Sequence, residues 1–94
     1  MIRVLIERHI AESLEPYYEE RSRQLLQRAV TAPGFISGET LVDLSDPNHR
    51  MTLCNWRSVA DWDHWYRSQE RQGLMDELVA LLEREEKVTI LEQS

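Results

Sequence analysis

The sequence has few of the residues that build several common functional sites. It contains one cysteine, Cys54, and therefore no internal disulfide and no multi-cysteine zinc or iron–sulfur site. Its three glycines, Gly34, Gly38 and Gly73, are too scattered for a phosphate-binding loop. No stretch approaches the roughly 18 apolar residues of a membrane span, and residues 1–9 lack a signal-peptide pattern. We therefore expect a cytoplasmic protein without membrane contact.

Positive charge is also scarce. The chain has 11 Lys and Arg against 17 Asp and Glu, which gives a net charge of −6. A surface that follows nucleic-acid phosphates needs clustered Lys and Arg, so we expect no nucleic-acid partner. With 94 residues and 41% hydrophobic content, the chain is expected to form a single globular domain over residues 1–94.

The spacing of apolar residues predicts four strands and two helices. Residues 2–9 alternate in polarity and are rich in β-branched side chains, which indicates a strand. The other predicted strands are 35–44, 50–57 and 87–91, and the helices are 14–31 and 58–85. A turn is expected at 46–48.

Five residues predict where the helices begin and weaken. Ser13 is expected to cap the first helix, with Pro16 in its first turn. Ser58 and Asp61 have capping-box spacing and predict the start of the second helix. Gly73 is expected to weaken or kink that helix.

The resulting order, β-α-β-β-α-β, predicts a ferredoxin-like α+β fold. In this arrangement a four-stranded antiparallel sheet has its helices on one face. Apolar residues occupy both faces of the predicted strands, since Leu5 opposes Ile6 and Leu53 opposes Cys54. An uncovered sheet face of this kind favours a partner. We therefore expect a homodimer that packs sheet on sheet.

Aromatic residues form one candidate site. Trp62 lies three residues before Trp65 and four before Tyr66, so the three rings share one side of a helix. Such a side can form a stacking wall for a planar aromatic substrate. Large aromatic residues at this spacing belong to the core more often than to a ligand site. We therefore interpret Trp62 as a core residue, and for Trp65 and Tyr66 both interpretations stay open here.

Arg8 is a second candidate because it follows Ile2, Val4 and Ile6 on the strand face that helices should cover. A buried guanidinium needs an anion or acceptor. It can hold a phenolate, enolate or carboxylate of a substrate, or it can pair with Glu39 on the neighbouring strand.

The remaining polar residues are weaker candidates for a functional site. Asn55 and Tyr18 are candidate pocket groups or satisfied core residues. His49 is predicted in a solvated turn, His64 on a solvated helix face, and His9 towards the dimer interface. No histidine spacing matches a metal site. The carboxylate-rich run 83–86 is interpreted as a solvated helix face.

Three stretches carry a resemblance to a known family. They are Ile6-Glu7-Arg8-His9-Ile10, then Ala32-Pro33-Gly34-Phe35-Ile36-Ser37-Gly38-Glu39, and finally Asn55-Trp56-Arg57-Ser58-x-x-x-Trp62-x-x-Trp65-x-x-Ser68-x-x-Arg71. Together with the strand order, they make nearly the whole chain resemble the antibiotic biosynthesis monooxygenase (ABM) superfamily of dimeric α/β barrels.

The resemblance implies a pocket in each subunit between the sheet and the helices. Some relatives oxidise phenolic polyketides or quinols there with molecular oxygen and no cofactor, and others bind and degrade haem. Trp65 matches the tryptophan of the haem-degrading pattern, whereas Arg8 replaces its asparagine and Met75 its histidine. The quinol-oxidising pattern has histidines at places that look to be Trp65 and Glu70 here. Neither pattern therefore identifies a general base.

From the resemblance, we interpret the chain as a cofactor-independent monooxygenase, an oxidoreductase that acts on a small aromatic phenol, quinol or polyketide-like substrate. The implied mechanism is deprotonation in a dry pocket, electron transfer to oxygen and recombination of the radicals. The expected substrate-binding residues are Arg8, Trp65, Asn55 and Tyr66, with no metal ion and no identified catalytic base. The alternative is a non-catalytic module of the same fold that binds a small ligand or haem.

Overall fold

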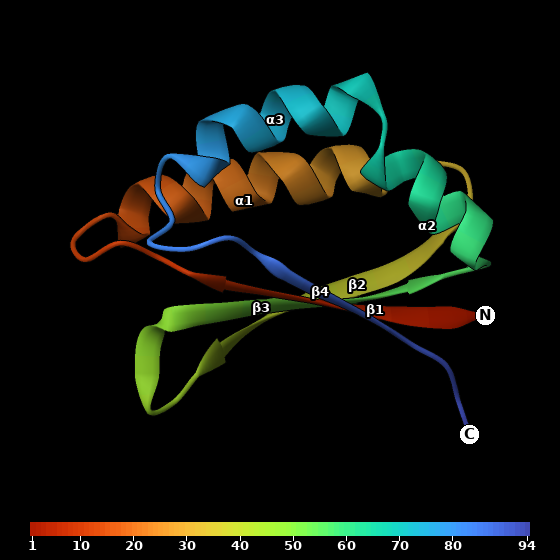
Figure 1. Ribbon diagram of the computed structural model, residues 1–94, viewed down its shortest axis with the longest axis horizontal. Coiled ribbons are helices and arrows are strands. Elements are labelled where there is room, and N and C mark those ends of the chain that lie inside the picture. The colour runs from red at the N-terminus through yellow and green to blue at the C-terminus, as the bar shows by residue number, and fades with distance from the viewer.

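Four strands and three helices follow one another along the chain (Figure 1). The computed structural model describes residues 1–94. The elements are β1 (Ile2–His9), α1 (Glu15–Ala29), β2 (Phe35–Asp43), β3 (Asp46–Trp56), α2 (Val59–Tyr66), α3 (Gln69–Val79) and β4 (Lys87–Leu91). The strands pair antiparallel in the order β2-β3-β1-β4, and the helices lie on one face of the sheet. The predicted ferredoxin-like α+β fold is therefore confirmed.

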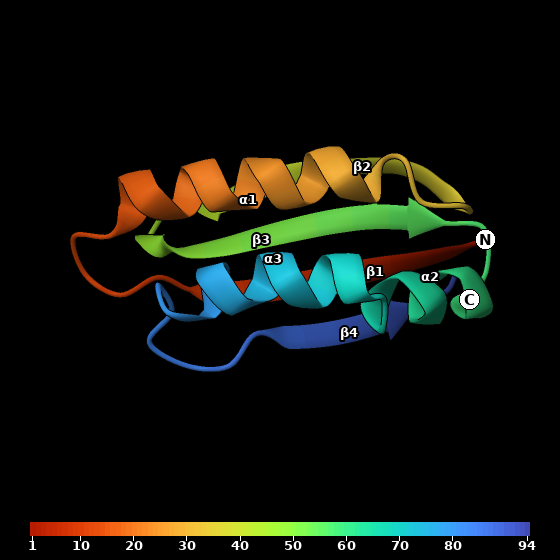
Figure 2. The same cartoon turned by 90° about the horizontal axis from the view of Figure 1, so that it is seen from above.

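The core lies between the sheet and the helices. α1 runs above β2 and β3, while α3 runs above β1 (Figure 2). Along β1, Ile2, Val4 and Ile6 are buried and the residues between them are not, as expected of a strand covered on one face. Full burial of side chains such as Val4 and Leu78 stabilises the fold by about 1.5–3 kcal/mol each. The buried apolar residues are Ile2, Val4, Ile6, Ile10, Tyr18, Leu25, Ala29, Cys54, Trp56, Trp62, Trp65, Met75 and Leu78.

The β2–β3 hairpin turns earlier in the chain than the sequence predicts. β2 ends at Asp43 and β3 begins at Asp46, so the turn consists of residues 44 and 45. The Asp43 carboxylate accepts hydrogen bonds from the backbone N–H and the hydroxyl of Ser45, at 2.8 and 2.7 Å. This side-chain turn closes the hairpin tightly, and the predicted turn at 46–48 is instead the start of β3.

The start of α1 also differs from the prediction. Ser13 has a φ of 73°, in the left-handed region, and Leu14 occupies the N-cap position without a side-chain hydrogen bond. Ser13 is therefore not the cap. Pro16 does lie at the start of the helix, where its missing N–H removes no helical hydrogen bond.

The second predicted helix is divided into α2 and α3. Ser58 begins α2 as predicted, because its Oγ accepts a hydrogen bond from the N–H of Asp61 at 3.2 Å. The break lies at Ser68, whose Oγ accepts from the N–H of Arg71 at 3.1 Å and begins α3. Gly73 lies inside α3, so the predicted weak point is displaced by about one turn. None of the helices is long and apolar enough to cross a membrane.

No helix covers the other face of the sheet (Figure 1). The antiparallel register places Arg3, Leu5, Glu7 and His9 of β1 on this face, beside their β3 partners Asn55, Leu53, Met51 and His49. We refer to it below as the open face.

Candidate functional site

A small cavity lies between the sheet and the helices, and we call it the inner cavity. Its volume is about 30 Å³, and its lining includes both Arg8 and Trp65. Space of this size holds about two water molecules. Ser22 of α1, Thr52 of β3 and Arg71 of α3 also line it, so with Arg8 of β1 and Trp65 of α2 five elements meet there.

Arg8 reaches this cavity from the covered face of β1. The residue is 2% exposed, and its Nε donates to Oε2 of Glu86 at 2.9 Å. Its Nη1 donates to the hydroxyl of Tyr18 at 3.2 Å. Burial lowers the pKa of Arg8, but the interactions with Tyr18 and Glu86 outweigh it and raise the pKa above its ordinary value. The guanidinium is therefore charged.

The alternative pairing of Arg8 with Glu39 is wrong. Glu39 lies opposite Leu53 in the β2–β3 ladder and so belongs to the open face, on the other side of the sheet from Arg8. The actual partner, Glu86, comes from the segment between α3 and β4.

Glu86 joins two buried arginines. Its Oε2 accepts from Arg8, and its Oε1 accepts from Nη2 of Arg71 at 2.8 Å. Burial acts to raise the pKa of Glu86, but the two guanidinium groups outweigh it and hold the pKa below the usual range of glutamate. The carboxylate is therefore ionised and serves both arginines at once.

Arg71 is positioned by α3 and by aromatic rings. Ser68 fixes the first turn of α3, and Arg71 lies on the same side of the helix as the buried Met75 and Leu78. Its guanidinium lies 4.7 Å from the ring centre of Tyr66 and 5.7 Å from that of Trp62. Such cation–π contacts favour a charged guanidinium in a site with little water.

Aromatic rings form part of the lining of the inner cavity. Trp56, Trp62 and Trp65 all line it and are each at most 5% exposed. The Trp56 ring meets Phe35 edge to face at 5.4 Å and Trp62 at 5.7 Å. This interlocked packing makes Trp62 a core residue, as the sequence indicates, and Trp65 belongs to the same buried cluster.

Cys54 also lines the inner cavity, as a neutral thiol. Its sulfur accepts a hydrogen bond from Nε1 of Trp56 at 3.3 Å and lies 3.6 Å from the carbonyl oxygen of Val4. Burial raises the pKa of this thiol despite the opposing effects of Trp56 and the two buried arginines. It is therefore poorly suited to act as a nucleophile at neutral pH.

The structure does not bring Asn55 or Tyr66 to this cavity. Asn55 pairs with Arg3 across the ladder and lies on the open face, where its Nδ2 donates to Oγ of Ser37 at 2.9 Å and its Oδ1 has no partner. Tyr66 is 38% exposed and contacts Arg71 from the outer side. Of the four expected substrate-binding residues, Arg8 and Trp65 lie together.

A larger hollow adjoins the inner cavity on the side of β2, and we call it the outer groove. It runs between α1 and the β2–β3 hairpin and has a volume of about 380 Å³. Ser22, Leu26 and Thr52 line both spaces. Tyr18, which binds Arg8, also lines the groove. A volume of this order suits a small organic ligand.

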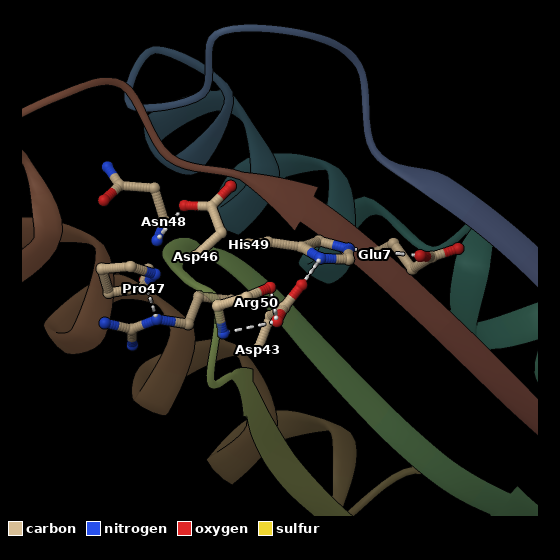
Figure 3. Close-up of polar contacts among 8 residues, drawn as sticks. Glu7, Asp43, Asp46, Pro47, Asn48, His49 and Arg50 are labelled. Carbon is tan, nitrogen blue, oxygen red and sulfur yellow. Dashed lines mark hydrogen bonds and ion pairs between the residues drawn. The ribbon is translucent and has the colours of Figure 1, made fainter.

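The histidines lie away from both spaces. His49 is on β3, where its ring nitrogens contact Asp43 at 3.0 Å and Glu7 at 3.2 Å (Figure 3). Its ring stacks on His9 with centroids 4.5 Å apart. The hydrogen bond to Asp43 is the main cause that raises the pKa of His49. Because His49 lies within β3 and its side chain is 19% exposed, the prediction of a solvated turn residue is wrong. His64 is exposed, as predicted.

The family model for antibiotic biosynthesis monooxygenases matches residues 1–77. Among solved structures, an antibiotic biosynthesis monooxygenase is 18% identical with a TM-score of 0.90, covering 100% of this chain and 99% of that one. A conserved protein from Methanosarcina mazei Go1 is 18% identical with a TM-score of 0.91, covering 99% and 92%. SnoaB, a cofactor-independent oxygenase from Streptomyces nogalater, is 11% identical in a mutant form with a TM-score of 0.87, covering 98% and 91%.

A search of curated protein sequences gave no match. At these identities the solved structures establish the shared fold, and the family model spans most of the chain. The resemblance carried by β1, β2 and the tryptophan-rich run is thereby confirmed. The chain belongs to the antibiotic biosynthesis monooxygenase family.

Proposed function

We propose that the protein is a monooxygenase that oxidises a small aromatic phenol, quinol or polyketide-like compound with molecular oxygen and without a cofactor. The observation that carries this proposal is that Arg8 and Trp65 line one buried cavity in a member of this family. SnoaB, a neighbour in fold, is a cofactor-independent oxygenase, which is consistent with this chemistry.

The reaction balances without an external reductant. Loss of a C–H proton leaves a carbanion stabilised by the aromatic system, and transfer of one electron to oxygen gives a substrate radical and superoxide. Their recombination forms a C–O bond in a peroxide. Cleavage of the O–O bond with loss of water then leaves a carbonyl, so one oxygen atom enters the product and the other leaves as water.

The protein contributes charge, shape and exclusion of water to these steps. Arg8 is fixed by Glu86 and Tyr18, so its positive charge is preorganised for the anion that deprotonation creates. Trp65 offers an apolar ring beside it. No side chain in the cavity is an evident base, and the proton therefore leaves to water or to oxygen-derived anions in this proposal.

The volumes of the inner cavity and the outer groove determine which part of the substrate each can hold. The inner cavity, at about 30 Å³, is too small for an aromatic ring, whereas the outer groove, at about 380 Å³, accommodates one or two rings. The ring system therefore enters through the groove, with its reacting edge towards Ser22 and Thr52.

The alternative, a non-catalytic module that binds haem, has less support from the site. No histidine lines the inner cavity or the outer groove, so an imidazole ligand for haem iron is not supplied there. We derive no step through haem.

We also propose that the protein acts as a cytoplasmic homodimer that packs through the open face. Leu5, Met51 and Leu53 lie on this face, and Asn55 has an unpaired acceptor there. A second copy would cover these groups. A mass equal to one chain in sedimentation at micromolar concentration would contradict the dimer.

The activity is tested by oxygen consumption with anthrone and with naphthalene-type quinols as substrates. The expected result is oxidation well above the rate without protein, reduced about tenfold or more in Trp65→Phe, because the ring that lines the inner cavity next to the reacting edge is smaller. His64→Gln, on the exposed side of α2, is the matched control. Oxidation no faster than in buffer alone would refute the proposal for these substrates.

A further inference from the structure

The buried charges around the inner cavity do not balance. Arg8 and Arg71, which are 2% and 4% exposed, share the single carboxylate of Glu86. Cys54 is a neutral thiol because burial raises its pKa. Arg50, which lies beside Arg8 in the sheet, is already paired with Glu19 at 3.1 Å. The site therefore holds one positive charge more than it holds negative charges.

Donor groups on both arginines also remain free. Arg8 uses Nε and Nη1, and Arg71 uses Nη2, for their side-chain hydrogen bonds within the chain. No side-chain hydrogen bond of the chain uses Nη2 of Arg8, or Nε or Nη1 of Arg71, and both residues line the inner cavity. A buried guanidinium with unused donors is a ready partner for an oxyanion.

We infer that the inner cavity binds the acidic group of a ligand that carries one negative charge, with its aromatic body in the outer groove. This inference rests on the proposed function and names its substrate class: an aromatic compound that already bears a carboxylate or phenolate when it binds.

Size and long-range charge both favour this arrangement. A carboxylate has two oxygens and fits the space of about two water molecules in the inner cavity, about 30 Å³. The chain as a whole carries a net charge of −6 and therefore repels anions from most of its surface. Selective binding of an anion must then come from a local site, and the Arg8–Arg71 pair provides one.

If Arg71 had a purely structural role, its substitution would affect ligand binding differently. The rings of Tyr66 and Trp62 already stabilise its charge, so Arg71 could serve only to hold α3 and Glu86 in place. In that case its removal lowers stability but leaves the ratio of affinities for charged and neutral ligands unchanged. The inference requires that this ratio change, since Arg71→Gln would leave Arg8 and Glu86 as a neutral pair.

The experiment compares naphthoate with naphthamide, which share the ring system and differ in charge. Their affinities are measured at neutral pH by calorimetry and by quenching of tryptophan fluorescence, because all three tryptophans line the cavity. The wild-type protein should bind naphthoate about tenfold more tightly than naphthamide, from one charge-assisted hydrogen bond. In Arg71→Gln the ratio should fall to about one.

The matched control is Arg67→Gln, which removes the same charge from an arginine whose side chain is 77% exposed and pairs with Asp63. This variant should retain the preference for naphthoate. Equal or tighter binding of naphthamide by the wild-type protein, or no naphthoate binding at millimolar concentration, overturns the inference even if Arg71→Gln does not fold. Persistence of the preference in folded Arg71→Gln overturns it as well.

These outcomes separate the inference from the proposed function. If the protein oxidises neutral quinols but shows no preference for naphthoate, the inference fails and the monooxygenase activity stands. If it selects naphthoate and oxidises none of the substrates, the anion site stands and the proposed activity fails.

Discussion

Replacing Glu86 with glutamine tests whether the buried charge network holds the protein together. The side chain of Glu86 is 11% exposed and neutralises part of the charge on Arg8 and Arg71. Glutamine has the same shape but no charge, so Glu86→Gln leaves two buried guanidinium groups without an anion. Breaking a buried ion pair in this way costs about 3–5 kcal/mol.

That loss is large against the total stability. A chain of this length has a free energy of unfolding of about 5–14 kcal/mol. In urea denaturation, a loss of 3 kcal/mol lowers the midpoint by about 1–3 M. Glu83→Gln is the control, because Glu83 belongs to the same segment but its side chain is 49% exposed and forms its ion pair with Arg84. Its midpoint should change by less than about 0.5 M.

The pH dependence of stability gives a second measure of the same network. The pKa of Glu86 is lowered from 4.5 in the folded protein, so its contribution is fully present above that pH and is lost as the pH falls through the folded pKa. The difference between wild type and Glu86→Gln should therefore be constant near neutral pH and shrink in acid. Midpoints that coincide at neutral pH would refute the reasoning.

Four further substitutions test other parts of the structure. Gly34→Ala should lower the urea midpoint, because Gly34 has a φ of 89° and an added Cβ would lie 2.4 Å from Asp61, whereas Gly73→Ala, with nothing within 4 Å, should raise it slightly. Because the pKa of His49 is raised in the folded protein, protonated His49 stabilises the fold fully below the usual pKa of 6.5, and this stabilisation is lost as the pH rises through the raised pKa. His49→Gln should remove this pH dependence of the melting temperature in thermal denaturation. Leu26→Trp should fill the outer groove and weaken naphthoate binding about tenfold or more in the calorimeter, with equal effect on naphthamide.

Features set by local spacing could be predicted from the sequence. The alternation of residues 2–9 identified β1 with its bounds, and it placed Arg8 on the covered face in line with Ile6. The spacing of Ser58 and Asp61 identified the start of α2. A strand has a period of two and a cap acts within four residues, so a few neighbouring residues contain the information.

Glu86 shows why the charge partner of Arg8 could not be predicted in the same way. It lies 78 residues from Arg8 in the chain, and its neighbours Glu83 and Glu85 make it look like part of a solvated helix. The helix instead ends at Val79, and the segment that follows runs below the helix to β4 (Figure 1). The burial of Arg71, in contrast, could have been predicted from the sequence, because its spacing from Met75 and Leu78 places all three on the apolar side of α3.

Asn55 was assigned to the wrong side of the sheet for a related reason. Alternation shows that Asn55 shares a face with Leu53, but it does not show which face the helices cover. That choice depends on pairing with β1, where Asn55 lies beside Arg3 and Thr52 lies beside Ile6. Only the register of two distant strands places Thr52 in the cavity and Asn55 outside it.

The same register makes the candidate site and the open face depend on each other. Glu7 and Arg8 are neighbours in β1, yet Glu7 binds His49 on the open face while Arg8 binds Glu86 under the helices. A slip of one residue between β1 and its neighbours would move Arg8 to the open face and Glu7 to the face under the helices. The carboxylate of Glu7 would then be buried where the free guanidinium donors now lie. The His49 contacts with Glu7 and Asp43 oppose that slip, because they tie β1 to both strands of the hairpin. The positive charge of the cavity is thus maintained in part by residues on the far side of the sheet.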